Sequence, residues 1–439
     1  KGKGEVNIGL LTPYITQENK ISESSLAGNT TKSEVLNLIP SFFSVCKIND
    51  DLALGFGFYF PYGGGKLQYE DALDYDGVPG AYQYDLKKDL RISLPENKRK
   101  DFLASRGEHY NAKIITEYFK SQGLNAQLML PEKIGFYVSN EFSNAKVLPI
   151  SYKNIKKTIN DDMISVIPGF YGVTEKSDVA VFSRGGSDLT GGEIAYALSA
   201  TLYENWTDTN GIYQVDPRII KDADVIPRLT YKEIRLLSSK GFNVFHYDAM
   251  IKCKKRNIPI NIKNTNNPDA QGTMIVSERV PEEVVVGIAR KDNIAYLYLE
   301  KDGAGEKIGF VSDLLEILKN YGIETYHYPT DKDDVSVILN QDDLIDCVDD
   351  LKENIYSELK PEKLEMNYNI TILSPVGIGM KDHPGIIASA ATAMKEENIS
   401  IEIIDQGPAQ ISFHFGIQNY YADKALSALY QKLIKELKI

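Results

Sequence analysis

Residues 179–188 read Val-Ala-Val-Phe-Ser-Arg-Gly-Gly-Ser-Asp, an apolar β-type run that turns through two glycines into a helix beginning near Ser187. Glycine lets the backbone approach an anion closely, and the first N–H groups of a helix point outward at its positive end. The segment therefore predicts a strand, turn and helix that bind a phosphate, with the fork of Arg184 available for a carboxylate. A plain helix start capped by Ser187 explains the same residues equally well.

Strands alternate with helices on both sides of this segment. Apolar, β-rich runs occupy residues 164–167, 179–182, 202–206 and 258–262. Apolar residues recur at helical spacing over 194–202 and again over 234–244. This alternation predicts an α/β fold with an open, mainly parallel sheet and helices on both faces. Ligands of such sheets bind at the carboxyl ends of the strands.

The C-terminal part of the chain repeats itself. After a turn-rich stretch at 264–268, two units each read strand, helix, strand, strand, helix and strand. Gly309 and Gly385 are 76 residues apart, and so are Ser336 and Ser412. Equal spacing at two separate features indicates a duplicated βαββαβ unit.

Length and charge narrow the class of protein. The chain has 439 residues, which suggests about three folding units. Asp and Glu total 61 against 49 Lys and Arg, so the net charge is −12. An acidic surface without a basic stripe predicts no nucleic-acid partner. No run approaches 18 apolar residues and no signal peptide is apparent, so we expect a cytoplasmic protein without a membrane partner.

Cysteine and histidine give no metal-site pattern. The three cysteines form no CxxC pair, and the five histidines are scattered without an HxxxH spacing. We therefore predict no protein-built metal centre and expect any metal to arrive with its ligand.

Two further motifs have both a structural and a functional interpretation. Ser105 to Glu108 reads as a capping box, or as a helix start whose Glu108 accepts the ammonium group of an amino acid. Trp206-Thr207-Asp208, followed by Tyr213 and Arg218, would hold the base, ribose and phosphates of a nucleotide, or form a surface turn.

The order of these motifs resembles that of the aspartokinase family, within the amino-acid-kinase superfamily. Phe182 to Asp188 stands before Trp206 to Asp208, Gly211 to Tyr213 and Asp216 to Arg218, as in that family. The duplicated unit resembles the family's paired ACT domains. The resemblance implies a carbamate-kinase-like catalytic domain over 1–275 and ACT-like units over 285–365 and 366–439. It also implies that the second unit is inserted in the first, to which the C-terminal helix returns.

The resemblance assigns roles to individual residues. Glu108, Arg184 and Ser187 would bind L-aspartate, Asp188 would order the phosphate-binding groups, and Lys20 would bridge the phosphates. ATP, with Mg²⁺, would be held by Thr207, Asp208, Tyr213, Arg218 and Lys263. An amino-acid effector, with lysine favoured, would bind near Phe310, Ser312, Asp334 and Ser336, and the ACT units would form a homodimer.

The family reaction moves the γ-phosphoryl group of ATP to the side-chain carboxylate of aspartate. Four residues depart from the family pattern: Ser22 and Glu23 replace glycines beside Lys20, Tyr62 replaces a substrate-binding serine, and Asn266 stands where relatives carry a basic residue. These departures leave two alternatives to an active aspartokinase. One is an impaired pseudokinase or amino-acid-sensing subunit, and the other is a kinase for a different amino acid.

Overall fold

The computed structural model describes residues 94–159, 162–183, 185–238, 247–304, 306 and 309–437, together with the backbone of a hairpin formed by β1 (Phe42–Asn49) and β2 (Leu52–Phe58). Lys20, Glu23, Tyr62 and Arg184 lie outside the described residues. No helix in the described part of the chain is long and apolar enough to cross a membrane.

The first described region contains the 179–188 segment. Its elements are α2 (Glu96–Ala104), α3 (Arg106–Ser121), β3 (Ala126–Leu128), α4 (Pro131–Ile134), α5 (Ile150–Thr158), β4 (Ile164–Val166), β5 (Tyr171–Val173), β6 (Val179–Val181) and α6 (Gly186–Leu198). β3 pairs parallel with β4, and β5 pairs antiparallel with β6. Phe136, Ile155 and Phe182 are buried in the core of this region.

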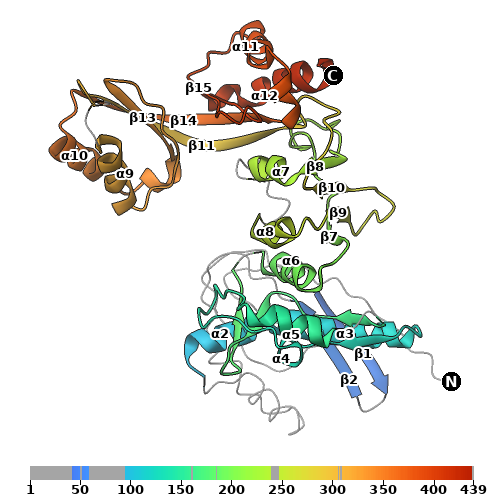
Figure 1. Cartoon of the computed structure of the whole chain (residues 1–439). Helices are drawn as coiled ribbons and strands as arrows, with labels where there is room; N and C mark the ends of the chain where they lie inside the picture. Colours follow the sequence, from blue (N-terminus) through green and yellow to red (C-terminus); the bar gives the residue numbers. More distant parts are fainter. Residues whose placement is uncertain are drawn as a thin grey trace, which may run out of the picture.

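A four-stranded sheet follows, with strand order β7-β9-β10-β8. Its region comprises β7 (Tyr203–Thr207), β8 (Arg228–Thr230), α7 (Tyr231–Ser238), α8 (Tyr247–Lys255), β9 (Ile260–Asn264) and β10 (Thr273–Val276). β7 and β9 are parallel, as are β8 and β10. The strands predicted at 164–167, 179–182, 202–206 and 258–262 are confirmed to within two residues. Figure 1 shows this region between the first region and the C-terminal one.

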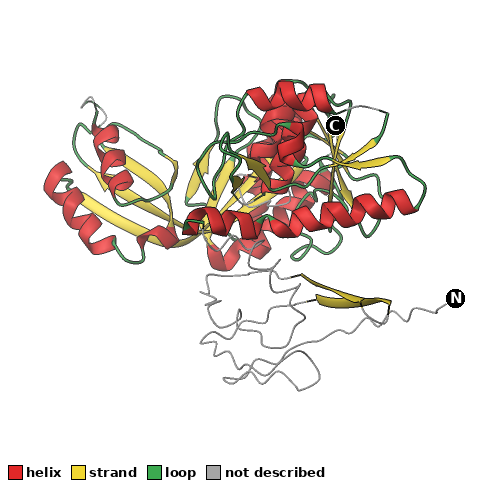
Figure 2. Ribbon diagram, turned by 90° about the horizontal axis from the view of Figure 1, so that it is seen from below, coloured by secondary structure: helices red, strands yellow, loops and turns green. Residues whose placement is uncertain are grey.

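One six-stranded antiparallel sheet, in the order β12-β13-β11-β14-β16-β15, carries the C-terminal region. Its first repeat uses β11 (Gly287–Glu300), α9 (Phe310–Asn320), β12 (Thr325–His327), β13 (Asp334–Asn340) and α10 (Val348–Leu359). The second uses β14 (Lys363–Val376), α11 (Ile386–Glu396), β15 (Ile403–Asp405), β16 (His414–Gln418) and α12 (Ala422–Tyr430). Short helical turns at 341–344, 378–382, 419–421 and 431–436 complete it. Figure 2 shows the helices of the first repeat beside the strands of this sheet at the left of the view, and in the second repeat α12 contacts β11 and β14.

The 76-residue repeat predicted from sequence is confirmed by the backbone. Gly309 and Gly385, which precede α9 and α11, both have φ of 89°. The long strands β11 and β14 start 76 residues apart, and each contains an asparagine with positive φ, Asn293 at 57° and Asn369 at 59°. The pairing of the two strands shifts register at this point, so each strand is divided there into two halves.

Within each long strand, the two halves belong to different repeats. The second half of β11 pairs with β13 and with the first half of β14, which completes the first unit. The first half of β11 pairs with the second half of β14, next to β16. The second unit therefore takes its fourth strand from residues that precede the first unit.

The packing of the C-terminal helix differs from the expectation. α12 lies against α11 in the second unit, where Leu426 and Leu429 share one core with Ala390 and Phe415. The expectation places this helix on the unit over 285–365; the helix does contact β11 of that range, but its main partner is α11 of the second unit. The physical reason is complementarity, because the apolar face of α12 covers the same side of the sheet as α11.

Candidate active site

The turn between β6 and α6 has the geometry of an anion site. Gly185 has φ of 77°, a left-handed conformation that glycine adopts at little cost. A Cβ on Gly186 would lie 2.7 Å from Phe170 Cδ2 and 2.9 Å from Phe182 Cβ, so only glycine fits there. The N-cap residue Gly185 has no side chain with which to cap the helix. The N-terminus of a 13-residue helix thus remains available for a negatively charged ligand.

Asp188 connects this turn to the next strand. Asn205 Nδ2, on β7, donates a hydrogen bond of 2.8 Å to Asp188 Oδ1. The Tyr203 hydroxyl donates to the Asp188 carbonyl oxygen at 3.3 Å. Burial raises the pKa of Tyr203, which keeps this hydroxyl protonated as a donor. The first turn of α6 is therefore held in a fixed position relative to β7.

Ser187 lies against a loop that sequence reasoning missed. Its side chain is exposed, and a Cβ on Gly169 would lie 3.2 Å from Ser187 Oγ. Phe170, next in the chain, has a positive φ of 73° and donates its N–H to Thr190 Oγ1 of α6. The Pro168-Gly169-Phe170 stretch is the only sequence signal for this contact, and a proline-glycine pair indicates a turn without indicating its neighbour.

Glu108 lies in the first turn of α3, half-buried. Its charge contributes to the raised pKa of Tyr171, which is due mainly to burial, and Tyr171 directly follows Phe170 in the chain. His109, the next residue of α3, has its Nδ1 3.0 Å from the Tyr171 hydroxyl, so the first turn of α3 lies beside this loop. The capping-box interpretation is wrong, because Ser105 has helical backbone angles and its Oγ donates to Phe102 O at 2.7 Å.

Asp101 supports the turn and was not anticipated from the sequence. Its carboxylate is fully buried and accepts hydrogen bonds from Ser143 N at 2.7 Å, Ser143 Oγ at 2.8 Å and Val181 N at 2.9 Å. Val181 ends β6, immediately before the turn. No local pattern marks a carboxylate whose partners lie 42 and 80 residues away.

Three predicted nucleotide-binding residues meet at one sheet edge. β7 and β9 are parallel, with Trp206 opposite Lys263 and Thr207 opposite Asn264, so Thr207, Asp208 and Lys263 lie at neighbouring carboxyl ends. Lys263 Nζ lies 5.0 Å from the Trp206 ring centroid. Thr265 N donates to Thr207 O at 2.8 Å and ties the two strand ends together.

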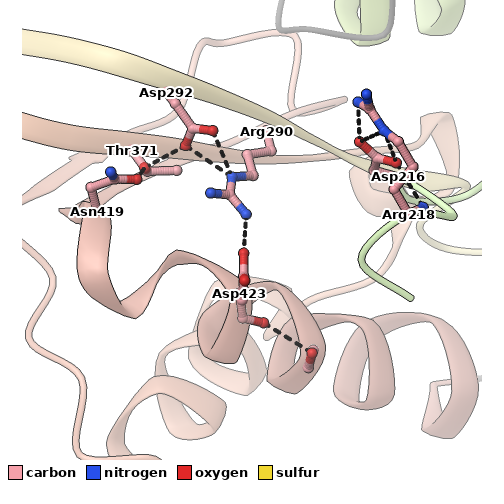
Figure 3. Close-up of polar contacts among 8 residues, drawn as sticks. Asp216, Arg218, Arg290, Asp292, Thr371, Asn419 and Asp423 are labelled. Atoms are coloured by element: carbon pink, nitrogen blue, oxygen red, sulfur yellow. Dashed lines mark hydrogen bonds and ion pairs between the residues drawn. The ribbon is translucent and has the colours of Figure 1, made fainter. Parts of the chain in front are cut away.

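Tyr213 and Arg218 lie in the connection between β7 and β8. Tyr213 packs against the core of the second repeat. Arg218 is exposed and forms a fork with Asp216, with Nε to Oδ1 at 3.0 Å and Nη2 to Oδ2 at 2.6 Å (Figure 3). Hydrogen bonds from Arg218 hold the pKa of Asp216 below its ordinary value. In this conformation Arg218 is paired with its own loop.

Two family models match the chain, one over the catalytic part and one in the C-terminal region. A model of the amino acid kinase family matches residues 62–264, and an ACT domain model matches residues 373–433. Aspartokinase 3 of Bacillus subtilis is 38% identical over 334 residues, which cover 76% of this chain and 74% of the relative. The chain belongs to the aspartokinase family.

Solved structures agree with this assignment. The crystal structure of Clostridium acetobutylicum aspartate kinase has a TM-score of 0.73 and 34% identity, over 80% of this chain and 79% of that one. The structure of E. coli aspartokinase III with lysine and aspartate, at 20% identity and a TM-score of 0.65, shares the fold over 82% of this chain and 83% of that one. This aspartokinase is thus an ATP-dependent aspartate kinase with an α/β catalytic part and regulatory ACT units.

The first ACT unit of this aspartokinase contains an open hollow of about 730 Å³ at the start of α9. Gly309, Phe310 and Ser312 line one side, and the loop with Thr330 and Lys332 lines the other. Two of the predicted effector residues, Phe310 and Ser312, therefore lie in its wall. Asp334 and Ser336 alternate along β13 with the buried Val335 and Val337, so they occupy the other face of the strand.

Proposed function

We propose that the aspartokinase reaction takes place between the N-terminus of α6 and the carboxyl ends of β7 and β9. The observation that carries this proposal is the bond from Asn205 to Asp188. It joins the anion-binding turn to the strand whose end carries Thr207 and Asp208. The two half-sites, whose linked residues are 17 positions apart in the sequence, thereby become one site with a fixed separation.

The chemistry requires alignment more than proton transfer. An aspartate side chain has a pKa near 3.9, so its carboxylate is already ionised at pH 7. One carboxylate oxygen forms the new bond to the γ-phosphorus, while the bond from that phosphorus to the oxygen shared with the β-phosphate breaks and ADP leaves. Bringing an anion to a polyanion calls for positive charge and oriented N–H groups. The uncapped start of α6 supports this role.

We assign the remaining residues on the same basis. Glu108 binds the ammonium group of aspartate, and Ser187 and Arg184 bind its carboxylates. Thr207, Asp208 and Lys263 hold the nucleotide, with Tyr213 and Arg218 joining them when the Arg218–Asp216 pair opens. Lys20 bridges the phosphates. Mg²⁺ would enter with ATP and supply charge neutralisation at the phosphates.

The hollow beside α9 is our candidate for the effector site. Asp331 offers a carboxylate to an ammonium group of lysine. Glu306 and Lys332, which pair with each other at 3.6 Å between Oε1 and Nζ, would bind the second ammonium group and the carboxylate once that pair opens. The start of α9 at Gly309 adds backbone N–H groups for the same carboxylate. We further propose that the ACT units pair two chains into a homodimer.

The test is a coupled assay of ADP release with and without L-aspartate, on wild type and Asn205→Ala. Loss of one hydrogen bond to a charged group costs about 1.5–3 kcal/mol, so we expect a tenfold to hundredfold lower kcat/KM for ATP. Asn354→Ala, on α10 in the regulatory region, is the matched control and should behave as wild type. Aspartate-independent ADP release, or an Asn205→Ala variant with wild-type kinetics, would contradict the proposed site.

A further inference from the structure

Two histidines and an aspartate from different repeats converge at the C-terminal sheet. His327 ends β12, Asp405 ends β15 and His414 begins β16. One ligand atom from each lies within 4.8 Å of the others, and His327 Nδ1 is 3.1 Å from Asp405 Oδ2. The imidazole ring centroids of the two histidines are 4.8 Å apart.

The curvature of the sheet brings these three side chains together. β12 and β15 are the two outer strands in the sheet order, yet His327 and Asp405 are in contact. The register shifts at Asn293 and Asn369 bend the long central strands. Ile294, Ile338, Ile370 and Ile372 then pack together, with Tyr326 and Ile403 against them, and close the space between the two repeats.

A further side chain positions His414. This histidine is 6% exposed, and its Nδ1 lies 2.7 Å from Ser374 Oγ on β14. This contact fixes the orientation of the ring, and in the tautomer in which Nδ1–H donates to the hydroxyl, Nε2 has the lone pair that a metal requires. His327 and Asp405 have side chains 23% and 35% exposed, which leaves an entry path from solvent.

We propose that His327, Asp405 and His414 form a binding site for a divalent transition-metal ion of the zinc class. Two imidazoles and one carboxylate are ligands that Zn²⁺ accepts, with water in the fourth position. Tetrahedral ligands at about 2.0–2.1 Å from zinc are about 3.4 Å from one another. In the cluster, one pair of ligand atoms is 3.1 Å apart and all three lie within 4.8 Å of one another. These distances are close to the tetrahedral value, so small side-chain rotations are enough to complete the coordination sphere. Mg²⁺ and Ca²⁺ prefer all-oxygen sites with more ligands.

The consequence concerns regulation. His327 comes from the first repeat, whereas Asp405 and His414 come from the second. A bound ion would therefore crosslink the two ACT units and oppose any rotation between them. This role is separate from the Mg²⁺ that accompanies ATP at the catalytic site.

The experiment uses the full chain after chelator treatment and dialysis, without nucleotide. Zn²⁺ binding is measured by calorimetry, and Co²⁺ binding by its visible absorption, whose intensity reports tetrahedral geometry. We expect one equivalent of metal per chain and a d–d spectrum without a sulfur charge-transfer band. His327→Gln and Asp405→Asn should each weaken binding at least tenfold, and Ser374→Ala, which removes only the orienting hydroxyl, about tenfold.

His383→Gln is the matched control, because this histidine lies in the second repeat outside the cluster. It should bind metal as wild type does. The proposal would be overturned if the wild-type chain bound no metal, or if the cluster variants bound it as tightly as wild type. A cobalt–thiolate absorption band would also overturn it. The wild-type stoichiometry and the Ser374→Ala result decide the matter even if a ligand variant fails to fold.

Discussion

At the scale of single residues, the candidate active site depends on buried polar side chains that do not touch substrate. Asp101 accepts three hydrogen bonds and fixes the end of β6, while Asn205 fixes Asp188. A buried carboxylate costs free energy unless its acceptor positions are filled, and here the donors come from two separate segments. The glycine turn that follows β6 is positioned by these contacts.

We predict that Asp101→Asn destabilises the chain. The new amide NH₂ would face donors, and leaving a buried donor unsatisfied costs about 1–3 kcal/mol. Urea unfolding followed by circular dichroism measures the change in the free energy of unfolding. Asp269→Asn, in an exposed loop, is the matched control and should change it by less than about 0.5 kcal/mol. Equal stability of the two variants would show that Asp101 is dispensable.

At the scale of elements, the decisive feature is the start of α6. The N-cap position is a glycine with positive φ, which has no side chain to cap the helix, and it is followed by a glycine enclosed by Phe170 and Phe182. Helix ends that only stabilise the fold are commonly capped by Ser, Thr, Asp or Asn. The arrangement found here favours ligand binding over local stability.

Gly186→Ala is predicted to reduce activity while the chain stays folded. The added methyl group would lie under 3 Å from Phe170 Cδ2 and Phe182 Cβ, so the start of α6 must move. A displacement of the order of 1 Å costs about a hundredfold in rate when reactants must align, and we expect a loss of about tenfold to hundredfold in kcat. Gly407→Ala is the control, since a Cβ there meets nothing within 4 Å. Wild-type kcat for Gly186→Ala would remove the turn from the active site.

At the scale of the whole molecule, one buried ion pair joins the catalytic and regulatory parts. Glu233, on α7, accepts hydrogen bonds from Arg279 Nη2 at 2.8 Å, from Thr230 N at 2.8 Å and from Ile378 N at 2.9 Å. Ile378 follows β14 in the second ACT unit, and Arg279 lies in the segment between the two parts. These hydrogen bonds connect the regulatory region directly to α7.

We predict that Glu233→Gln weakens this junction. Removing one partner of a buried ion pair costs about 3–5 kcal/mol, because the other charge remains buried. Urea unfolding should show this loss, and limited proteolysis should cut the 277–286 segment faster. Glu282→Gln, an exposed neighbour, is the matched control. Unchanged stability and unchanged cleavage in Glu233→Gln would exclude a structural link here.

The Glu233–Arg279 ion pair also predicts how the stability of the chain depends on pH. Burial opposes ionisation of Glu233, but hydrogen bonds from Arg279, Ile378 N and Thr230 N outweigh it and hold the pKa of Glu233 below its ordinary value of 4.5. A lowered folded-state pKa contributes stability above pH 4.5, which is lost as the pH falls through the lower folded-state value. An acid titration of unfolding should therefore be less steep below pH 4.5 for Glu233→Gln than for wild type. Equal slopes would show that this carboxylate does not titrate with unfolding.

The sequence alone determined the features that depend on neighbouring residues. The β6–α6 turn, the strands β7 and β9, the family motifs and the 76-residue repeat were all predicted, because side-chain periodicity and glycine positions are local properties. Tertiary structure decided which segments meet. It paired Arg218 with Asp216, placed Asp101 beneath β6, and packed α12 on α11. It also brought together His327, His414 and Asp405, which the sequence had shown as scattered. Such contacts depend on strand curvature and core packing between residues far apart in the chain, and no local pattern records them.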